Sequence, residues 1–477
     1  MSFWEFKNID LDGIALIDDN SKQTYSYREL RDLSSTISAK FDKNHKKLTF
    51  VFCDNSAINV ILYLSQLICT NAIYLADVKM DDSLKNNLIA IYQPEYIFDI
   101  KENIIGYDAV NILGNYFLHK NLSPTPITIY NETAVLLSTS GTTGSPKLVR
   151  LSYKNILANA VSIAEYLNID KNERAITSLP ISYSYGLSVL NSHLLKGASV
   201  ICTNKSIVVK DFWNLFKEYS STSFAGVPYM YQTLQKIRFH TMSLPSLRTM
   251  TQAGGRLSEE FIKYFYNLSK EKNFKLFIMY GQTEATARIS YVPYSMLESK
   301  IGSIGISIPG GELTLENESK IITEPETNAE LIYRGNNVML GYASNVEDLE
   351  KGDELNGVLR TGDLAHFDND GYFYITGRTK RFLKIFGLRL NLDEVEKMIE
   401  NNFHLPNACF GNDDQLSVLV ESDDSNNLDK VKYKIIDIYK LHHSVLKVSI
   451  TNKIPVTSSG KKDYLMIKDF ISNATNR

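Results

Sequence analysis

The feature that most constrains the fold is a repeated alternation of strand-like and helix-like segments in the first half of the chain. Runs rich in β-branched and aromatic residues, such as 47–53 and 72–76, alternate with amphipathic runs, such as 56–67 and 155–167. This spacing is typical of parallel sheets covered by helices. The sequence therefore predicts an α/β fold over most of its length.

A different pattern begins near residue 302. Short alternating strands are expected at residues 312–315, 329–333 and 372–375, with turns such as Asn369-Asp370-Gly371 between them. A basic stretch after Gly377 then leads to residues 391–394, where Asn and Glu have the spacing of a helix capping box. We expect an antiparallel β region there, followed by a small α+β domain.

Composition narrows the classes of function. The 477 residues include 51 Lys and Arg and 54 Asp and Glu, so the formal net charge is −3. A near-neutral balance argues against a dedicated nucleic-acid binder or a protein of anionic membranes. The most apolar long stretch, residues 60–75, contains several polar residues and is too short to span a membrane.

The cysteines and histidines suggest neither a disulfide framework nor a zinc site. The four cysteines are far apart without a Cys-x-x-Cys pair, and the eight histidines form no His-Glu-x-x-His motif. These spacings favour reduced thiols in a cytoplasmic protein and argue against a zinc hydrolase. The first residues also lack the apolar run of a secretory signal.

One loop carries the strongest chemical signal. Residues 138–147 read Ser-Thr-Ser-Gly-Thr-Thr-Gly-Ser-Pro-Lys, after a strand-like run and before a helix-like one. Glycines let backbone N–H groups face an anion, hydroxyls add donors and Lys147 adds charge, as in a polyphosphate loop. The Walker pattern is absent. The alternative is a solvated linker, and the preceding strand and the closing Pro146-Lys147 argue against it.

Further motifs follow in order along the chain. They are residues 24–30 (TYSYREL), 179–187 (LPISYSYGL), 226–228 (GVP), 253–255 (AGG), 280–284 (YGQTE), 330–342 (ELIYRGNNVMLGY), 361–363 (TGD), 377–387 (beginning Gly-Arg) and 459–461 (SGK). Together with the loop, this series resembles the adenylate-forming, or AMP-binding, enzymes. These include the acyl-CoA synthetases, the adenylation domains of nonribosomal peptide synthetases, and firefly luciferase. The resemblance covers nearly the whole chain.

The resemblance implies a fold and a reaction. The fold would be a large N-terminal domain of α/β layers with a distorted β-barrel region, residues 1–379, and a small, mobile α+β domain, residues 380–477. The reaction would join a carboxylic acid to ATP in the presence of Mg²⁺, release pyrophosphate, and pass the acyl group to a thiol. That thiol would belong to CoA or to phosphopantetheine on a separate carrier protein.

The same resemblance implies the nucleotide site. Its residues would be Thr139, Ser140, Gly141, Thr142, Thr143, Gly144, Lys147, Gly254, Gly255, Tyr280, Asp363, Arg378 and Lys384. Asp363 can accept from both ribose hydroxyls through two carboxylate oxygens, although a turn-capping role is the alternative. Tyr280 would stack on the adenine, or would simply be a core aromatic. Glu284 would bind Mg²⁺, and Thr283 would lie near the α-phosphate.

Two lysines carry the proposed chemistry of the small domain. Lys461 matches the family's catalytic lysine, whose ammonium offsets charge while the substrate carboxylate attacks the α-phosphate. Lys461 would block the thiol in the second half-reaction, so the small domain would rotate about a hinge at Lys380. A surface lysine between domains is the alternative for Lys380.

The expected substrate pocket consists of Tyr183, Ser184, Tyr185, Gly226 and Tyr229. Ser184 stands where amino-acid-activating domains usually place an Asp, and a buried ammonium without a carboxylate is costly, so an ordinary α-amino acid is disfavoured. Tyr183 stands where acyl-CoA synthetases commonly carry His. Other departures are Leu148, where the family usually has Gly, and residues 441–445 (LHHSV), in place of the usual stretch before the catalytic lysine.

The leading hypothesis is a free-standing, AMP-forming acid–thiol ligase. A non-catalytic relative that binds a nucleotide or an acyl-adenylate is the first alternative, but Lys147, Glu284, Asp363, Arg378 and Lys461 are all present. A luciferase-like oxygenase shares every motif and is the second alternative. The identity of the acid and the choice of thiol stay open at this point.

Overall fold

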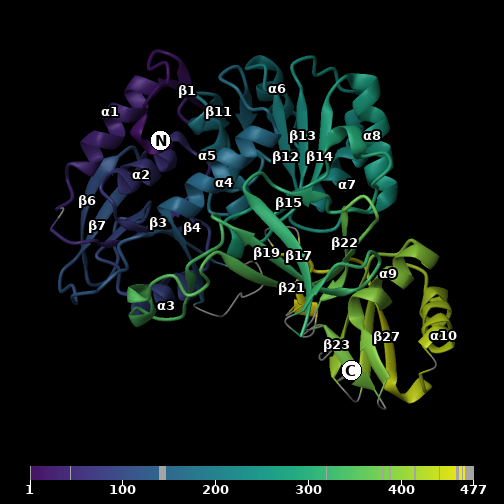
Figure 1. Ribbon diagram of the computed structural model, residues 1–477. Coiled ribbons are helices and arrows are strands. Elements are labelled where there is room, and N and C mark those ends of the chain that lie inside the picture. Colours follow the sequence, from purple (N-terminus) through teal and green to yellow (C-terminus); the bar gives the residue numbers. More distant parts are fainter. Residues whose placement is uncertain are drawn as a thin grey trace. The chain divides into compact units, whose positions relative to one another are not determined.

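The computed structural model in Figure 1 describes residues 2–42, 44–138, 147–318, 320–378, 381–385, 388–412, 415–439, 441–457, 461–464 and 466–467. The chain forms two compact units: residues 1–312 with 333–359, and residues 313–332 with 360–477. The division into units concerns packing, whereas the boundary predicted at residue 380 concerns motion. Lys380 lies outside the described residues, so that boundary stays a prediction.

The first unit contains a nine-stranded sheet with the order β16-β15-β14-β13-β12-β10-β11-β1-β2. Its strands are β1 (Ile14–Asp18), β2 (Gln23–Ser26), β10 (Arg174–Ile176), β11 (Ser199–Cys202), β12 (Ser223–Gly226), β13 (Thr249–Gln252), β14 (Lys275–Tyr280), β15 (Ser290–Tyr291) and β16 (Ile306–Ser307). The strands from β14 to β1 in this order run parallel, and the pairs at both edges are antiparallel. The predicted parallel sheet is confirmed.

The same unit contains an eight-stranded sheet with the order β20-β9-β8-β4-β3-β5-β7-β6. Its strands are β3 (Leu48–Cys53), β4 (Ala72–Asp77), β5 (Tyr96–Asp99), β6 (Tyr107–Leu113), β7 (Tyr116–Asn121), β8 (Thr133–Ser138), β9 (Leu148–Ser152) and β20 (Gly341–Ala343). The centre, β8-β4-β3-β5, is parallel, and the flanking pairs are antiparallel.

One strand of this sheet is not among the predicted elements. The sequence predicts a helix-like run at 155–167, after the loop of residues 138–147, and β9 lies between the two and pairs antiparallel with β8. Leu148, Val149 and Leu151 are buried in β9, and the ladder satisfies their backbone groups. The strands that precede and follow this segment in the sequence are therefore paired with each other, with Ser138 opposite Leu148.

Helices fill the layers around the two sheets. They are α1 (Tyr27–Ser38), α2 (Ala57–Ile68), α3 (Asp82–Tyr92), α4 (Tyr153–Tyr166), α5 (Ser184–Leu195), α6 (Lys210–Glu218), α7 (Pro228–Lys236) and α8 (Glu259–Lys272). One hydrophobic cluster joins α2, α4 and α5 to both sheets, so these helices lie between them (Figure 1). Helices α6, α7 and α8 cover the other face of the nine-stranded sheet, and α3 packs on the eight-stranded sheet.

Helix α2 shows why this layering needs a particular sequence. Its residues, AINVILYLSQLI, are buried on almost every side because the helix faces α/β layers in both directions. A helix that is apolar all round is stable only in such a position. The few polar side chains bond within the layer: Gln66 Oε1 accepts from the Thr49 hydroxyl at 3.0 Å and from Asn71 Nδ2 at 2.9 Å.

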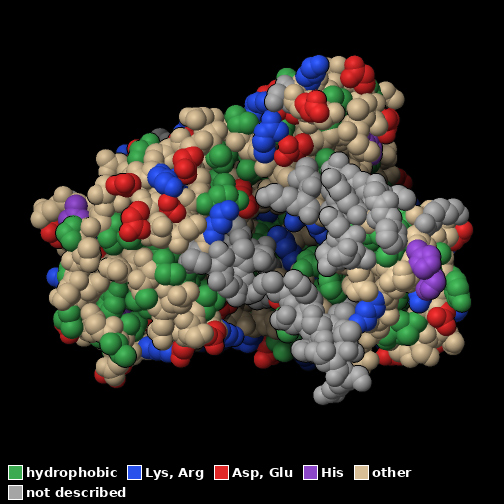
Figure 2. All heavy atoms as spheres, turned by 90° about the horizontal axis from the view of Figure 1, so that it is seen from below, with side chains coloured by type: hydrophobic (Ala, Val, Ile, Leu, Met, Phe, Trp, Pro, Cys, Tyr) green, Lys and Arg blue, Asp and Glu red, His purple; other side chains and the backbone are tan. Residues whose placement is uncertain are grey.

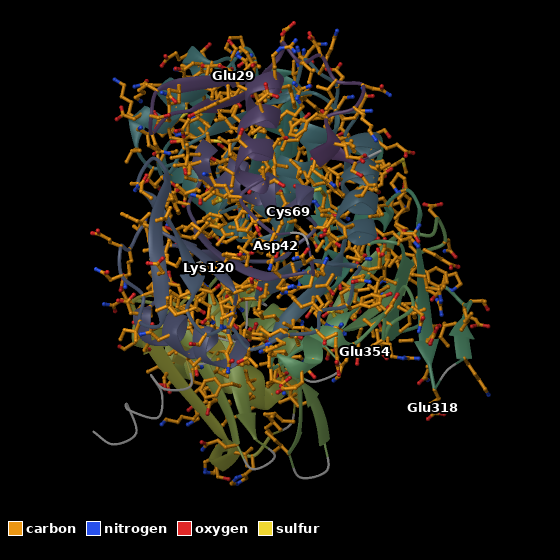
Figure 3. The ribbon with its side chains drawn as sticks, turned by 90° about the vertical axis from the view of Figure 1, so that its left-hand side faces the viewer. Glu29, Asp42, Cys69, Lys120, Glu318 and Glu354 are labelled. Carbon is orange, nitrogen blue, oxygen red and sulfur yellow. The ribbon has the colours of Figure 1, made fainter. Side chains whose placement is uncertain are left out.

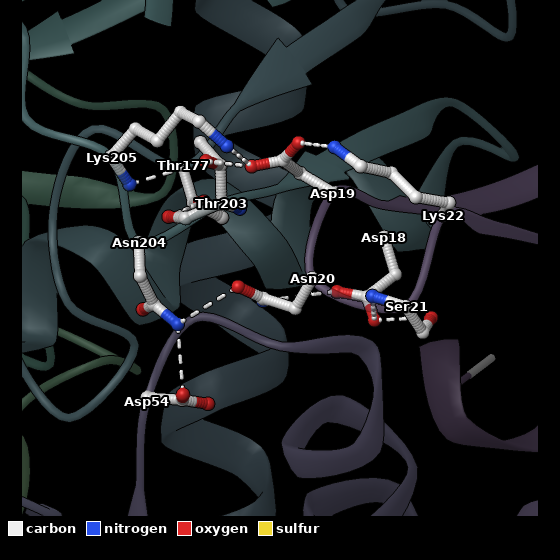
Figure 4. A network of polar contacts seen from close by, with 10 residues as sticks. All are labelled: Asp18, Asp19, Asn20, Ser21, Lys22, Asp54, Thr177, Thr203, Asn204 and Lys205. Carbon is white, nitrogen blue, oxygen red and sulfur yellow. Dashed lines mark hydrogen bonds and ion pairs between the residues drawn. The ribbon is translucent and has the colours of Figure 1, made fainter. Parts of the chain in front are cut away.

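A polar network joins the carboxyl ends of strands from the two sheets (Figure 4). Asp19, just after β1, accepts from the Thr203 hydroxyl at 3.0 Å and forms ion pairs with Lys205 and Lys22. Asn204 Nδ2 donates to Asp54, after β3, at 2.8 Å. Burial alone would raise the pKa of Asp19, but the two lysines outweigh it and lower the pKa. Ion pairs and hydrogen bonds therefore hold the segments that follow β1, β3 and β11 together.

The second unit begins with the five-stranded sheet β18-β17-β19-β21-β22. Its strands are β17 (Gly311–Asn317), β18 (Lys320–Ile322), β19 (Ala329–Gly335), β21 (Val358–Phe367) and β22 (Phe373–Arg378). A ribbon of β23 (Phe382–Ile385) and β24 (Leu388–Asn391) follows, and then α9 (Leu392–Phe403), β25 (Asn407–Asn412), β26 (Gln415–Glu421), α10 (Asn426–Tyr439) and β27 (Leu446–Thr451). The expected antiparallel strands and α+β segment are confirmed.

The state of the cysteines and the distribution of surface charge agree with what the sequence predicts. The four cysteines are free and buried, and Cys69 lies inside the first unit (Figure 3). Acidic and basic side chains are interspersed on the face in Figure 2, as the small net charge predicts. Among the described helices, none is long and apolar enough to cross a membrane.

The central layer yields a stability prediction. We expect Leu64→Ala in α2 to lower the free energy of unfolding by about 2–5 kcal/mol, because the side chain is fully buried and leaves a cavity. The control is Val161→Ala in α4, where the side chain is 47% exposed and the change should stay within about 0.5 kcal/mol. Urea unfolding measures both, and equal losses would contradict the layering.

Candidate active site

The centre of the candidate site is the turn that follows β14. Gly281 is required there, because a Cβ atom would lie 1.8 Å from the carbonyl oxygen of Ala287. The chain closes on itself through a short 3₁₀ turn, Thr283–Ala285. This close approach presents Thr283 and Glu284 on a rigid turn.

Asn337 holds this turn from outside. Its Nδ2 donates to the carbonyl oxygens of Ala285 and Arg288, both at 2.9 Å, and its Oδ1 accepts from the Tyr333 hydroxyl at 2.7 Å. Its own carbonyl accepts from the Thr286 hydroxyl at 2.7 Å. The backbone N–H of Met339 donates to Glu284 O at 2.9 Å. Asn337 and Met339, which belong to the motif at residues 330–342, therefore hold the turn in place by hydrogen bonds.

Tyr342 joins two of the predicted site residues. Its hydroxyl donates to Glu284 Oε1 at 2.9 Å, and Lys147 Nζ lies 3.4 Å from the centre of its ring. Burial, with the Glu284 carboxylate beside it, raises the pKa of Tyr342, so the hydroxyl stays a donor. The lysine that closes the hydroxyl-rich loop and the predicted metal carboxylate thus meet on one aromatic side chain.

The start of α5 reaches the same turn. Ser184 Oγ and Thr283 Oγ1 are 3.2 Å apart. Gly186 lets this helix begin so close to the preceding chain, because a Cβ atom there would lie 2.1 Å from Pro180 O. At Gly254, whose φ is +85°, a Cβ atom would lie 2.7 Å from the Tyr183 hydroxyl. Thr283, Ser184, Tyr183 and Gly254, all predicted site residues, therefore lie close together.

The remaining predicted pocket residues divide into two groups. Tyr185 is 2% exposed, and its hydroxyl donates to Thr251 O at 2.9 Å. Gly226 packs against Phe224 and Tyr231, where a Cβ atom would lie 3.0 Å and 3.1 Å from their rings. Tyr229, in contrast, is 43% exposed on α7, and its place in the pocket stays a prediction.

Two further residues, Gly255 and Tyr280, were predicted for the nucleotide site. Gly255 faces the ring of Pro228, and the Tyr280 hydroxyl accepts from Gln282 Nε2 at 3.1 Å.

The second unit brings together two predicted nucleotide residues. Asp363 and Arg378 are paired across β21 and β22, and Arg378 Nε lies 2.9 Å from Asp363 Oδ1. The Asp363 side chain is 3% exposed and that of Arg378 is 59% exposed. A buried carboxylate held by a more exposed guanidinium suits a ribose diol, which needs acceptors and donors side by side.

Lys461 lies next to a buried ion network. Glu396 in α9 accepts from Arg381 at 2.7 Å, Lys462 at 2.6 Å and the Tyr464 hydroxyl at 3.0 Å. Burial alone would raise the pKa of Glu396, but Lys462 and Arg381 outweigh it and lower the pKa. Glu396 thus links Arg381, which follows the predicted hinge residue Lys380, to Lys462, which follows the predicted catalytic residue Lys461.

Some predicted residues lie outside the described part of the chain. These are Thr139, Ser140, Gly141, Thr142, Thr143 and Gly144 of the loop, and Lys380. Lys384 is in β23, but its side chain is not among the described ones. Their roles stay predictions.

The residues present fit a nucleotide-bound Mg²⁺ ion. The described residues contain no group of three or more His, Cys, Asp or Glu that would form an all-protein metal cage. Mg²⁺ is usually held by one or two carboxylates together with substrate phosphates and water. Glu284 Oε1 accepts a hydrogen bond from the Tyr342 hydroxyl. Glu284 would hold the ion, which would neutralise phosphate charge when bound.

Comparison with known proteins decides the family. The model of the AMP-binding enzyme family matches residues 7–343. The chain belongs to the AMP-binding enzyme family. It is 30% identical over 270 residues to a 2-succinylbenzoate–CoA ligase of Bacillus subtilis, covering 56% of this chain and 54% of the relative. The aligned part spans about half to two thirds of the length of the first curated relatives that it matches.

Solved structures of this family share the fold. An o-succinylbenzoate CoA synthetase from Bacillus subtilis, solved with its acyl-adenylate intermediate, has 22% identity, a TM-score of 0.79 and 98% coverage of both chains. The same enzyme with ATP and a magnesium ion has 21% identity, a TM-score of 0.74 and 98% coverage of both chains. The predicted mixed α/β fold of an AMP-binding enzyme is confirmed.

Sequence reasoning did not single out three residues that contact the predicted site residues or the turn that carries them. Tyr342 and Asn337 are within a motif that was noted only as a whole, and no pattern marks which of its side chains turn inward. Arg288 follows Glu284 by four residues, and a charged residue among small and apolar neighbours was the available signal.

The hydrogen bonds of Asn337 give a second prediction. Replacing Asn337 with Ala removes one donor from each of two carbonyl oxygens and removes the acceptor of the Tyr333 hydroxyl, so we expect a loss of about 2–4 kcal/mol in stability and weaker nucleotide binding. Asn336→Ala, at the exposed neighbouring position, is the control and should change neither quantity. Thermal unfolding and ATP titration measure the two effects. A normal ATP affinity in Asn337→Ala would contradict the bracing role.

The ion network gives a third prediction. Glu396→Gln removes the carboxylate between Arg381 and Lys462, so we expect a loss of about 3 kcal/mol in local stability. Faster hydrogen exchange in α9 and β25 reports this loss. Glu394→Gln, on the exposed side of the same helix, serves as the control. Unchanged exchange in Glu396→Gln would show that the network does not hold this unit together.

Proposed function

We propose that this AMP-binding enzyme is an AMP-forming acid–CoA ligase. In the first half-reaction, a substrate carboxylate oxygen attacks the α-phosphorus of ATP, and the bond from that phosphorus to the bridging oxygen breaks. Pyrophosphate leaves and an acyl-adenylate forms. In the second, the sulfur of CoA attacks the acyl carbon, the bond to AMP breaks and the thiol proton is released.

The observation that carries this proposal is the meeting of Lys147 and Glu284 on Tyr342. A cation and a carboxylate that both contact the same tyrosine suit a polyphosphate and its Mg²⁺ ion. Thr283 and Ser184 lie next to this group, where the α-phosphate and the acid would meet. Alignment and fixed charge supply most of the rate enhancement in such displacements.

Residues of the second unit would complete the reaction. Asp363 would accept the ribose hydroxyls, and Arg378 would contact the ribose and phosphates. Lys461 would offset negative charge in the first half-reaction and leave the site for the second, by rotation about Lys380. The relatives named as CoA ligases support CoA as the thiol acceptor. A separate carrier protein is the alternative acceptor.

The fourth prediction tests the division of labour. We expect Lys461→Ala to slow ATP–pyrophosphate exchange by about 10²- to 10³-fold, because a positioned charge at the transition state is lost. Transfer from supplied acyl-AMP to CoA should change by less than about threefold. Lys430→Ala, an exposed lysine on α10, is the control. Equal losses in both half-reactions would refute the assigned role of Lys461.

The same assays separate the other hypotheses. A nucleotide-binding relative without catalysis would bind ATP but give no exchange with any acid. A luciferase-like oxygenase would form the adenylate but consume O₂ and give no CoA-dependent product.

A further inference from the structure

The inference starts from a buried arginine that has no ion-pair partner among the residues that the structure describes. Arg288 follows the turn at Glu284 and is 1% exposed. Its Nε and Nη1 atoms are buried and find no hydrogen-bond partner among the described residues. Guanidinium groups stay charged at every physiological pH, so Arg288 is a buried cation whose Nε and Nη1 groups lack hydrogen-bond acceptors among the described residues.

A second buried arginine in the same unit shows how unusual this is. Arg150 in β9 is fully buried, but it donates to the carbonyl oxygens of Tyr342, Lys351 and Gly352. It also forms an ion pair with Glu354, which lies at the surface (Figure 3). The fold therefore gives each nitrogen atom of the Arg150 guanidinium a partner, whereas two nitrogen atoms of Arg288 have none among the described residues.

Arg288 adds a charged group to a small cavity whose walls are mostly apolar. The guanidinium stacks on the Tyr185 ring, with its central carbon 3.8 Å from the ring centre. It lines a cavity of about 20 Å³ together with Thr251, His193 and Ser223. That volume accommodates one small polar group rather than a ring.

The neighbouring ionisable groups leave the charge of Arg288 unbalanced. Glu173 also lines the cavity, but its carboxylate pairs with Arg248 at 3.2 Å and accepts from the Thr222 hydroxyl. His193 donates from Nδ1 to Val189 O, and burial lowers its pKa, so the imidazole is neutral. The cavity is thus positive at Arg288 only.

The cavity lies beside the place where the acid would react. Arg288 stacks on Tyr185, and the adjacent Ser184 lies 3.2 Å from Thr283, which is close to the proposed α-phosphate position. Tyr185 and Ser184 thus connect Arg288 to Thr283 through two adjacent residues of α5. A substrate that contacts both Thr283 and Arg288 would therefore have a short chain.

We propose that Arg288 recognises a second carboxylate, so that the substrate is a short dicarboxylic acid. This inference rests on the proposed function. One carboxylate would be adenylated beside Thr283 and Ser184, while the other would accept hydrogen bonds from Nε and Nη1 of Arg288, as charge-assisted pairs favour. A methyl group in place of the second carboxylate would leave the buried charge unpaired.

The proposal makes a statement about stability as well as binding. A buried cation without a partner destabilises the empty protein, whereas a residue that only builds the fold stabilises it. We expect Arg288→Met to melt at the same temperature as the wild type or higher in the absence of ligand. Arg31→Met on α1, where the side chain pairs with the neighbouring Asp32, is the matched control.

The binding experiment uses pairs of acids that differ in one group. Malonate is compared with propionate, succinate with butyrate, and glutarate with pentanoate, by calorimetry with AMP present and by ATP–pyrophosphate exchange. The wild type should prefer one of the dicarboxylates over its partner by about 10- to 100-fold. Arg288→Met should lose most of that preference, and Arg288→Lys should keep part of it.

The two assays separate this inference from the proposed function. Selective binding of a dicarboxylate that Arg288→Met abolishes, without exchange for any acid, would support the anion site and overturn the ligase proposal. Exchange with a monocarboxylate that Arg288→Met leaves unchanged, or a large drop in melting temperature in both Arg288 variants, would overturn the role of Arg288.

Discussion

The tight turn between β14 and β15 is the constraint on which the candidate active site depends. Its backbone closes within 1.8 Å of where a side chain would begin at residue 281, so only glycine allows it. A turn this tight leaves backbone carbonyls that need donors, and Asn337 supplies two of them. The positions of Thr283, Glu284 and Arg288 all follow from this one closure.

The segment that braces the turn also carries part of its chemistry. Asn337 and Met339 bond to the turn, and Tyr342 lies three residues further on, in β20 beside β9. Because β9 begins directly after Lys147, the pairing of β20 with β9 places Tyr342 against that lysine. Stability and charge placement are therefore coupled through a single strand pairing.

The sequence predicts the layers well and the site only in part. Strand-like and helix-like segments such as 47–53 and 56–67 match β3 and α2, because layered sheets impose strong apolar patterns. The strand β9 was missed because its five residues, between a loop and a helix, show no separate pattern. The motifs identified Glu284 and Asp363, but not Tyr342 or Asn337, because contacts between residues 58 or 51 positions apart depend on tertiary structure.

Two residues near the proposed acid site, Ser184 and Arg288, influence which charge a substrate can carry. The resemblance to amino-acid-activating domains predicts that Ser184 stands where those domains place an Asp, and the start of α5 then offers a hydroxyl near Thr283 instead of a negative charge. Arg288, on the neighbouring turn, adds a positive charge without a protein counter-ion among the described residues. Both differences act in the same direction, because they disfavour a cationic substituent and favour an anionic one. An exposed arginine would be screened by water, whereas the buried Arg288 would act more strongly on a substrate charge beside it.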